Sequence, residues 1–217
     1  MNTMNKLLFT GSGRILSAGL CLVALSACGA LKPTTTPHPA YYALDNVQSA
    51  APVAMPAAAP TLIINPPHAT ASFASPRIIY VREAHKLEYF AQSEWIDPPA
   101  RMLAPLLVAA TANTGAFRAV VLTPSAAAGD LRLDTEIIRL QHEFGTLPSR
   151  VRFTLRANLV DNKTREVLAW REFDTSVAAA SEDAYGGVVA ANRAVATVLE
   201  NVSAFCAEVA RNAWKKK

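Results

Sequence analysis

The sequence is poor in the residues that carry most metal, redox and phosphate chemistry. It holds three cysteines, four histidines and nine glycines in 217 residues. No pair of histidines has the spacing of metal ligands; they are His38, His68, His85 and His142. No glycine-rich phosphate loop is present, because Gly186 and Gly187 are not followed by the lysine and hydroxyl residue of such a loop. We therefore predict no metal, no cofactor and no catalytic group of residues.

Neither positive nor negative charge dominates the sequence. Lysine and arginine number 21 against 17 acidic residues, which gives a net charge of +4. These charges are scattered, so we expect no nucleic-acid partner. Apolar residues make up 51% of the chain, enough for a sizeable core.

The first 27 residues have the pattern of a cleavable secretory signal. Lys6 and Arg14 supply positive charge, and no acidic residue occurs before position 28. The apolar run from Ile15 to Leu25 is too short to span a bilayer, which takes roughly 20 apolar residues. A short apolar run after a basic start predicts export.

The apolar run ends in a lipobox, Leu25-Ser26-Ala27-Cys28. Small residues beside the scissile bond suit a peptidase that cleaves between Ala27 and Cys28, and the Cys28 thiol is the acceptor of a lipid. A plain signal peptide that happens to contain a cysteine is the alternative. Once Cys28 is acylated and the signal is removed, Cys206 is the remaining thiol; we expect it to be a small buried hydrophobe.

The predicted signal peptide, residues 1–27, is followed by a lipidated, flexible tether, residues 28–40, and by one domain, residues 41–217. The tether is rich in proline and polar residues and cannot bury a core. Gly29 follows the lipidated cysteine in place of the aspartate that retains lipoproteins in the inner membrane. We therefore predict an outer-membrane lipoprotein whose domain faces the periplasm, attached to the membrane through its lipid anchor.

Short apolar and aromatic runs predict strands early in the domain, and one helix lies among them. The expected strands are Tyr41–Leu44, Thr61–Asn65, Arg77–Val81 and Phe117–Leu122. The expected helix has Asp97 as its N-cap, Pro98 as its first residue and Gly115 just past its end. Pro105 conflicts with this helix and should kink or shorten it. The Ala/Pro-rich stretch Ala50–Pro60 is expected to be a loop.

Three longer strands and a long helix are expected in the second half. Residues alternate between apolar and polar in Leu131–Leu140, Val151–Leu159 and Val167–Val177, which predicts an antiparallel meander. The alternation slips at Ile137 and Ile138, where we expect a bulge. From about Asp183 to Ala213 an apolar stripe recurs at helical spacing: Val188, Ala191, Val195, Val198, Val202, Phe205 and Val209.

This order predicts a single α/β domain in which a mixed β-sheet, including the meander, packs against two main helices. The stripe on the last helix should face the sheet, although a partner-binding stripe is the alternative. Tyr89, Phe90 and Trp95 are candidates for a partner contact, because they precede the first helix in a polar context. Packing at the edge of the core is the competing interpretation of these aromatics.

Several short motifs, taken in order, resemble the ABC-type transport auxiliary lipoprotein family, whose members are PqiC-like. No motif is specific alone, and the resemblance covers nearly the whole mature chain. Pro105 and the Ala/Pro-rich stretch depart from the pattern. The motifs are the lipobox, Tyr41–Leu44, Leu87–Phe90 with Trp95, Pro98-Pro99, Thr114–Phe117, Val120-Val121, and Leu131–Asp134 with the stretch to Phe144.

The resemblance implies a domain similar to the N-terminal domain of TolB and a role as an accessory component of an ABC transport system. It implies an MCE-domain protein as partner, transport of lipids or other hydrophobic molecules, and an outer-membrane docking subunit that forms a homo-oligomeric ring. The protein would then not be an enzyme. Two alternatives stay open: a periplasm-facing lipid carrier, and an envelope hydrolase using Ser93, Ser125 and His142.

Overall fold

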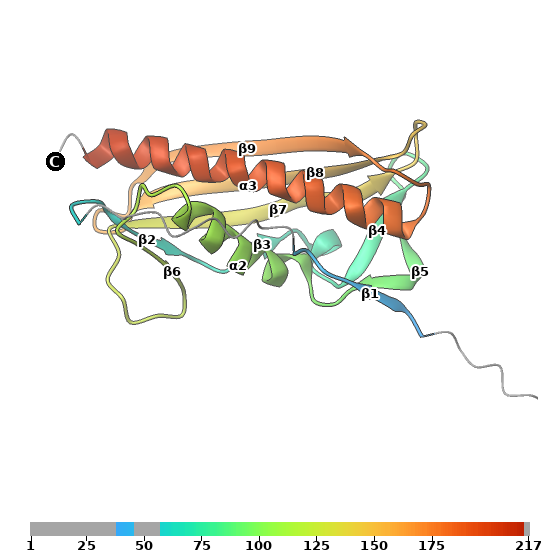
Figure 1. Cartoon of the computed structure of the whole chain (residues 1–217), viewed down its shortest axis with the longest axis horizontal. Coiled ribbons are helices and arrows are strands. Elements are labelled where there is room, and N and C mark those ends of the chain that lie inside the picture. Colours follow the sequence, from blue (N-terminus) through green and yellow to red (C-terminus); the bar gives the residue numbers. More distant parts are fainter. Residues whose placement is uncertain (1–37, 46–56, 215–217) are drawn as a thin grey trace, which may run out of the picture. The chain divides into compact units, whose positions relative to one another are not determined.

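The structure, a computed structural model, describes residues 38–45 and 57–214. From Pro39 onward the chain clusters into one unit, which contains nine strands, one short 3₁₀ turn and two α-helices among the described residues (Figure 1). The elements are β1 (Ala40–Tyr42), β2 (Thr61–Ile64), β3 (His68–Ala69), η2 (Ala71–Phe73), β4 (Arg77–Val81), β5 (Glu88–Trp95), α2 (Pro99–Ala112), β6 (Ala119–Leu122), β7 (Leu131–Glu143), β8 (Arg150–Asp161), β9 (Val167–Ala178) and α3 (Ala184–Trp214).

The long strand β7 organises the sheet. Along one side it pairs in parallel with β2, then β3, then β4, at successive stretches of its length. Along its other side it pairs antiparallel with β8, and β8 pairs antiparallel with β9. β6 extends the sheet beyond β2, while β5 and then β1 extend it beyond β4. The predicted mixed sheet with an antiparallel meander is confirmed.

Both helices cover the same face of the sheet (Figure 1). α3 packs along β8 and β9, and α2 packs against α3 and β6. The inward residues of β8, including Phe153, Leu155 and Leu159, are fully buried under α3. Arg152 and Arg156, which alternate with them, stay partly exposed on the other face. Because the side-chain period of a strand is two, this alternation divides the meander into a covered face and an open face.

The apolar stripe of the last helix packs into the core, as predicted. Val195 and Val202 are buried at its centre, and Phe205 meets Phe173 of β9 edge to face, with ring centroids 5.7 Å apart. The helix starts at a side-chain cap: the Gly186 backbone N–H donates to Asp183 Oδ1 at 2.7 Å. A carboxylate suits this position because the first N–H groups of a helix have no partner within the helix.

The predicted bulge is confirmed: the β7–β8 register shifts between Ile137 and Arg139.

The start of α2 was predicted one residue too early. Pro98 is the N-cap and Pro99 the first helical residue, and Asp97 instead forms an ion pair with Arg101 at 3.0 Å. Two consecutive prolines favour the later start, since a residue before proline is pushed out of the helical region.

Pro105 does not shorten α2, which runs from Pro99 to Ala112. Its ring lies on the exposed side of the helix, where water can solvate the carbonyl that loses its N–H partner. At the other end Gly115 adopts φ +62°, the left-handed conformation that glycine takes without steric cost.

Other boundaries also differ from the sequence prediction. β1 begins and ends earlier than predicted, and β6 begins two residues later, with Phe117 buried just before it. β3 and β5 were not predicted at all. β5 alternates little in hydrophobicity, and its extended conformation is fixed by pairing with β4 and β1. Most of Ala50–Pro60 lies outside the described residues.

The signal peptide, its cleavage site at Ala27 and Cys28, and most of the tether lie outside the described residues. These assignments and the domain boundaries stay predictions, as does the likeness to TolB. Within the described ranges, no helix is both long enough and apolar enough to cross a membrane.

Candidate functional site

The three aromatic residues predicted to contact a partner all lie on β5, in three different environments. Tyr89 is 49% exposed, and the Arg77 guanidinium lies over its ring, 4.2 Å from the centroid. This stacking holds the tyrosine in a defined orientation while leaving half of its surface open. Tyr89 therefore combines exposure with order, which is the property an interface residue needs.

Phe90 points to the other face of β5 and belongs to a half-buried aromatic cluster. The cluster consists of Tyr80, Phe90, His142 and Phe144. The Tyr80 and Phe90 rings lie 4.7 Å apart, and the His142 and Phe144 rings 4.2 Å apart. The Arg82 guanidinium lies over the Tyr80 ring at 4.9 Å. The cluster packs the ends of β4, β5 and β7 together and leaves Phe90 only partly available to a partner.

Trp95 is buried, with 2% exposure, and belongs to the hydrophobic core. For this residue the structure agrees with the core-packing alternative. A partner cannot reach the Trp95 side chain unless the core opens, so a contact surface on β5 has to rest on Tyr89 and the exposed rim of Phe90.

A polar cluster, buried at His142 and Ser149 and exposed at Glu182, ties the turn between β7 and β8 to the start of α3. His142 Nε2 lies 2.7 Å from Ser149 Oγ, and both residues are buried. The Ser149 backbone N–H donates to Glu182 Oε1 at 2.9 Å, and this bond holds the pKa of Glu182 below its usual value. The cluster thus links three elements that are separate in the sequence.

Burial lowers the pKa of His142 below 6.5, and the Glu182 and Asp183 carboxylates only partly oppose this shift. The second ring nitrogen, Nδ1, is buried and has no hydrogen-bond partner among the described atoms. It abuts Gly187 of α3, where an added Cβ would come within 2.5 Å of Nδ1. The neutral ring is therefore held on one side by its hydrogen bond to Ser149 and on the other by close contact with the backbone of Gly187.

This arrangement does not support the hydrolase alternative. His142 bonds to Ser149, whereas neither Ser93 on β5 nor Ser125 after β6 is a partner of His142 in the described structure. Ser149 itself has no exposed surface, so its hydroxyl is closed to a substrate. A nucleophile must reach its substrate, and this pair cannot.

A small pocket lies beside the cluster, lined by Ile78, Trp95, Leu140, His142 and Ala191, among others. Its volume is about 10 Å³, the room needed by one water molecule. An acyl chain does not fit there without rearrangement of the core.

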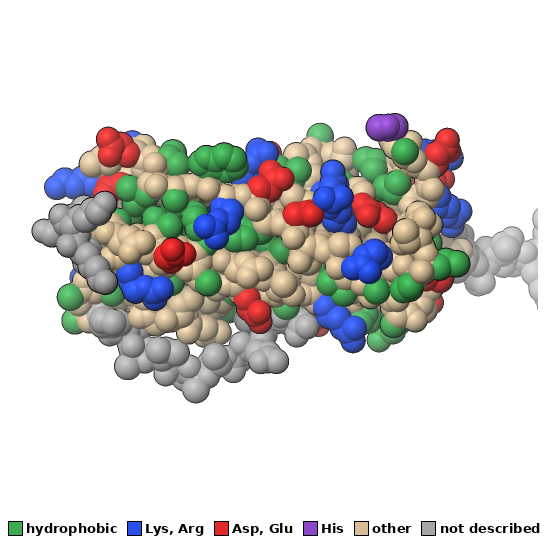
Figure 2. Space-filling view, turned by 90° about the horizontal axis from the view of Figure 1, so that it is seen from above, with side chains coloured by type: hydrophobic (Ala, Val, Ile, Leu, Met, Phe, Trp, Pro, Cys, Tyr) green, Lys and Arg blue, Asp and Glu red, His purple; other side chains and the backbone are tan. Residues whose placement is uncertain are grey.

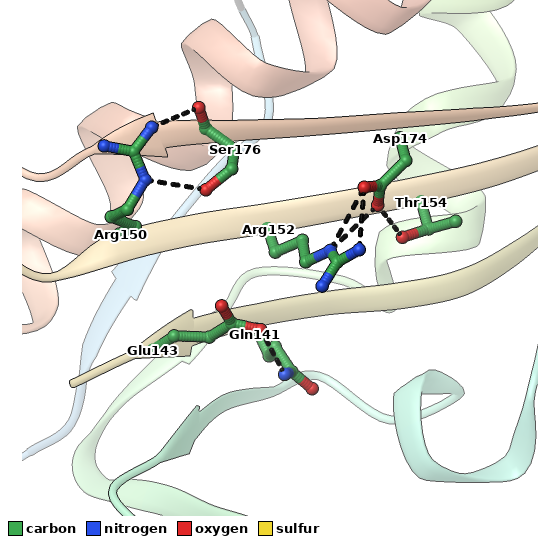
Figure 3. A network of polar contacts seen from close by, with 7 residues as sticks. All are labelled: Gln141, Glu143, Arg150, Arg152, Thr154, Asp174 and Ser176. Atoms are coloured by element: carbon green, nitrogen blue, oxygen red, sulfur yellow. Dashed lines mark hydrogen bonds and ion pairs between the residues drawn. The ribbon is translucent and has the colours of Figure 1, made fainter. Parts of the chain in front are cut away.

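The open face of the meander carries a polar network (Figure 3). Arg152 of β8 forms an ion pair with Asp174 of β9, with Nη2 2.9 Å from Oδ2. The Thr154 hydroxyl donates a hydrogen bond to the same carboxylate at 2.5 Å. The Arg152 guanidinium keeps the pKa of Asp174 below its usual value. Arg150 donates to the Ser176 hydroxyl and carbonyl at 2.9 and 2.8 Å.

A second bridge continues the network along the same face. Arg156 joins Glu136 of β7 and Glu172 of β9, at 3.2 and 3.1 Å.

Figure 2 shows basic and acidic side chains interspersed on the molecular surface, with hydrophobic groups between them. Mixed signs give this surface no strong field of either sign, so it has no electrostatic preference for a polyanion.

Metal and thiol chemistry find no support in the part of the chain that the structure describes. No group of three or more His, Cys, Asp or Glu residues there is placed to hold a metal ion. Cys206 is fully buried, and burial raises the pKa of its thiol to about 12, so it is not a thiolate at neutral pH. The prediction that Cys206 is a small buried hydrophobe is confirmed.

The fold and the closed core define a small mixed α/β domain, and solved structures share that fold. A crystal structure of a Xanthomonas campestris protein assigned to the family DUF330 matches with a TM-score of 0.72 and 22% identity, covering 81% of this chain and 98% of that one. A second crystal structure, of an uncharacterized protein, has a TM-score of 0.60 and 14% identity, covering 76% and 97%. At these identities the likeness shows the fold alone.

Residues 42–203 match the family described as the ABC-type transport auxiliary lipoprotein component. The chain belongs to this family. No curated protein matches the sequence. Membership makes the chain an auxiliary component of an ABC-type transport system and a lipoprotein associated with the cell envelope. The resemblance noted from the sequence is thereby confirmed.

Proposed function

We propose that this protein is the lipid-anchored, periplasm-facing docking subunit of an ABC transport system, at the outer membrane. In this role it binds the periplasmic part of an MCE-domain protein that moves lipids or other hydrophobic molecules. The family match over residues 42–203 carries the proposal. The burial of the one serine–histidine pair described above supports a binding role over a catalytic one.

The membrane attachment in this proposal is the lipid on Cys28, and Gly29 after it directs the protein to the outer membrane. The twelve residues from Gly29 to Ala40 extend at most about 40 Å. The domain therefore stays near its own membrane, and the partner has to cross the periplasm to reach it.

The proposed contact surface centres on Tyr89, with the rim of Phe90 beside it. Tyr89 is ordered by Arg77 and half exposed. Tyrosine and arginine are the residue types enriched where protein interfaces gain most of their binding energy.

The proposal includes a homo-oligomeric ring around the tip of the partner. A ring needs a heterologous interface repeated about an axis. The outer edge of β9 supports this idea, because β9 pairs only with β8 among the described strands and is 12 residues long. An unpaired edge of that length offers a row of backbone donors and acceptors to a neighbour.

The lipid-carrier alternative needs an apolar cavity of acyl-chain size. The pocket beside His142 has room for about one water molecule and does not meet that need. The family match over residues 42–203 favours the docking function.

Affinity purification of the tagged full-length protein from solubilised membranes tests the docking role. We expect the MCE-domain protein encoded with the same transport system to be recovered in amounts comparable to the bait. Recovery of the tagged protein alone, under conditions that keep other envelope complexes intact, would count against the docking role.

Two measurements test the anchor separately. Radiolabelled palmitate should enter the wild-type protein, and Cys28→Ser should leave an unprocessed, unlabelled precursor. Membrane fractionation should place the wild type with the outer membrane. Label in the Cys28→Ser protein would contradict the lipidation site, and an inner-membrane location would contradict the sorting alone.

A further inference from the structure

Three exposed apolar side chains gather around β1, where the described domain begins. Tyr41 lies on β1 and is 57% exposed, Ile96 follows β5 and is 62% exposed, and Tyr185 lies in the first turn of α3 and is 62% exposed. We call these three residues the β1 patch. Tyr41 and Tyr42 are consecutive on the edge strand β1, so Tyr41 lies on the opposite face of the strand from Tyr42, whose ring neighbours Tyr185. The β1 patch therefore flanks the edge of β1 on both sides.

A hydrogen bond, a ring contact and strand pairing join the three segments. The Ile96 backbone N–H donates to the Tyr42 carbonyl at 2.7 Å. The rings of Tyr42 and Tyr185 lie 6.3 Å apart between centroids. β1 itself pairs with β5, with Tyr41 opposite Glu94. The patch is thus built on a strand edge and a helix start that touch each other.

The chain just after β1 is fastened to α3, which makes the patch rigid. Asn192 of α3 accepts from the Asp45 backbone N–H at 3.0 Å and donates to the Ala43 carbonyl at 3.1 Å. Leu44, which stands between Ala43 and Asp45 in the chain, is buried. A side chain presented by such a fastened segment loses little conformational entropy when it binds a surface.

The position of the patch in the chain indicates which surface it meets. β1 is the first element after the predicted tether, and only eleven residues, Gly29 to Pro39, separate it from Cys28. If Cys28 carries the lipid, β1 is the part of the domain closest along the chain to the bilayer. Tyrosine is enriched at the level of lipid headgroups, where its ring meets acyl chains and its hydroxyl meets water.

We propose that the β1 patch contacts the headgroup region of the membrane that holds the lipid anchor. The inference rests on the proposed anchoring at Cys28. The patch orients the domain with β1 toward the lipid and leaves the far end of the meander directed away from it. None of the three patch residues is charged, and Arg77 and Glu94 beside Tyr41 balance each other across β4 and β5, so the contact depends on apolar burial and not on anionic lipid.

The test uses the full-length acylated protein in phosphatidylethanolamine–phosphatidylcholine vesicles. A polarity-sensitive fluorophore is placed on Tyr185→Cys and, separately, on Ile96→Cys, while Cys206 is buried and does not react. The matched control is Val167→Cys, because Val167 is 59% exposed at the opposite end of β9. The 12 residues of β9 place it ~36 Å from the end that leads to α3.

Spin-labelled lipid with its nitroxide near the headgroup then quenches the fluorophore if the site lies in the interface. We expect quenching at positions 185 and 96 to exceed that at position 167 several-fold and to persist in 0.5 M salt, ~3 times the physiological level, because screening weakens only charge-based adsorption. Equal quenching at all three positions in acylated protein would overturn the inference and leave the anchor intact.

Two further outcomes separate the sources of failure. If the fluorophore at position 185 becomes shielded without being quenched by spin-labelled lipid, the patch meets a protein and the inference is wrong. Mass spectrometry of the N-terminal peptide reports acylation directly. An unmodified Cys28 would overturn the anchoring proposal and, with it, the inference that depends on it.

Discussion

His142 Nε2 lies 2.7 Å from Ser149 Oγ, across the turn that joins β7 to β8. Seven positions separate the two residues, and neither is exposed. Through Ser149 the turn is also bonded to Glu182 at the entry to α3. A pair that resembles catalytic chemistry in composition therefore holds together the end of the domain where three elements meet.

The first prediction concerns pH. Because burial lowers the folded-state pKa of His142 below 6.5, the unfolded chain binds a proton before the folded chain does. The stabilisation is present above pH 6.5 and is lost as the pH falls through the lowered pKa. Thermal melts between pH 8 and pH 5 should show this loss in the wild type and a flatter profile in His142→Gln.

The Glu182 and Asp183 carboxylates do not contribute to the change in melting temperature between pH 8 and pH 5. The pKa values of Glu182 and Asp183 lie below their ordinary values of 4.5 and 3.8, so their contributions are lost only in more acidic solution. A wild-type melting temperature that is constant from pH 8 to pH 5 would contradict the neutral buried histidine.

The second prediction concerns Gly187. Alanine is the better helix former by about 1 kcal/mol, yet an added Cβ would come 2.5 Å from His142 Nδ1. Gly187→Ala should therefore destabilise the protein, by about 1–3 kcal/mol for an overpacked core. Gly145→Ala is the control, since nothing lies within 4 Å of its Cβ position. Urea unfolding measures both.

The same substitution has a second test in a double-mutant cycle. In a His142→Ala background the clash is gone, so Gly187→Ala should become neutral or stabilising. Equal destabilisation by Gly187→Ala in both backgrounds would show that His142 is not the group that Gly187 accommodates.

The third prediction concerns the core under α3. Val195→Asp or Val202→Asp buries a carboxylate without a partner at a position that is at most 2% exposed. The loss should be about 3–5 kcal/mol, the usual cost of an uncompensated buried charge. Ala204→Asp, on the exposed side of the same helix, should change stability by less than about 1 kcal/mol, most of it the lower helix propensity of aspartate. Unfolding curves that ranked the three variants equally would contradict the packing of α3.

The fourth prediction concerns the partner surface. Tyr89→Ala removes the exposed ring that Arg77 orders, so capture of the MCE-domain protein should fall at least tenfold, or ~1.4 kcal/mol. Leu147→Ala removes an exposed side chain from the turn between β7 and β8 and should leave capture unchanged. Both variants should keep the wild-type melting temperature. Undiminished capture by a folded Tyr89→Ala protein would contradict the site but not the function.

Periodicity was sufficient to predict the elements that bury one full face. The stripe on α3 and the alternation in β8 both place large apolar groups at fixed intervals, so the covered side can be read directly from the sequence. β5 could not be found that way. Its sequence, EYFAQSEW, contains as many polar as apolar groups, and the neighbouring strands β4 and β1 decide its conformation.

The candidate site was predictable only in part. Aromatic residues in a polar stretch drew attention to Tyr89 and Trp95, but the sequence does not reveal that one is stacked and exposed while the other is in the core. The His142–Ser149 bond depends on how the β7–β8 turn closes. No local signal marks Ser149, since its role arises from the pairing register of two long strands.

Sedimentation of purified components tests most directly whether this protein docks an MCE-domain partner. The acylated full-length protein in detergent is mixed with the periplasmic part of the MCE-domain protein encoded beside it, and analytical ultracentrifugation follows complex formation. We predict a complex that sediments faster than either component and contains several copies of this protein around each partner assembly. Independent sedimentation of the two proteins at micromolar concentrations, ~8 kcal/mol of binding free energy or less, would contradict it.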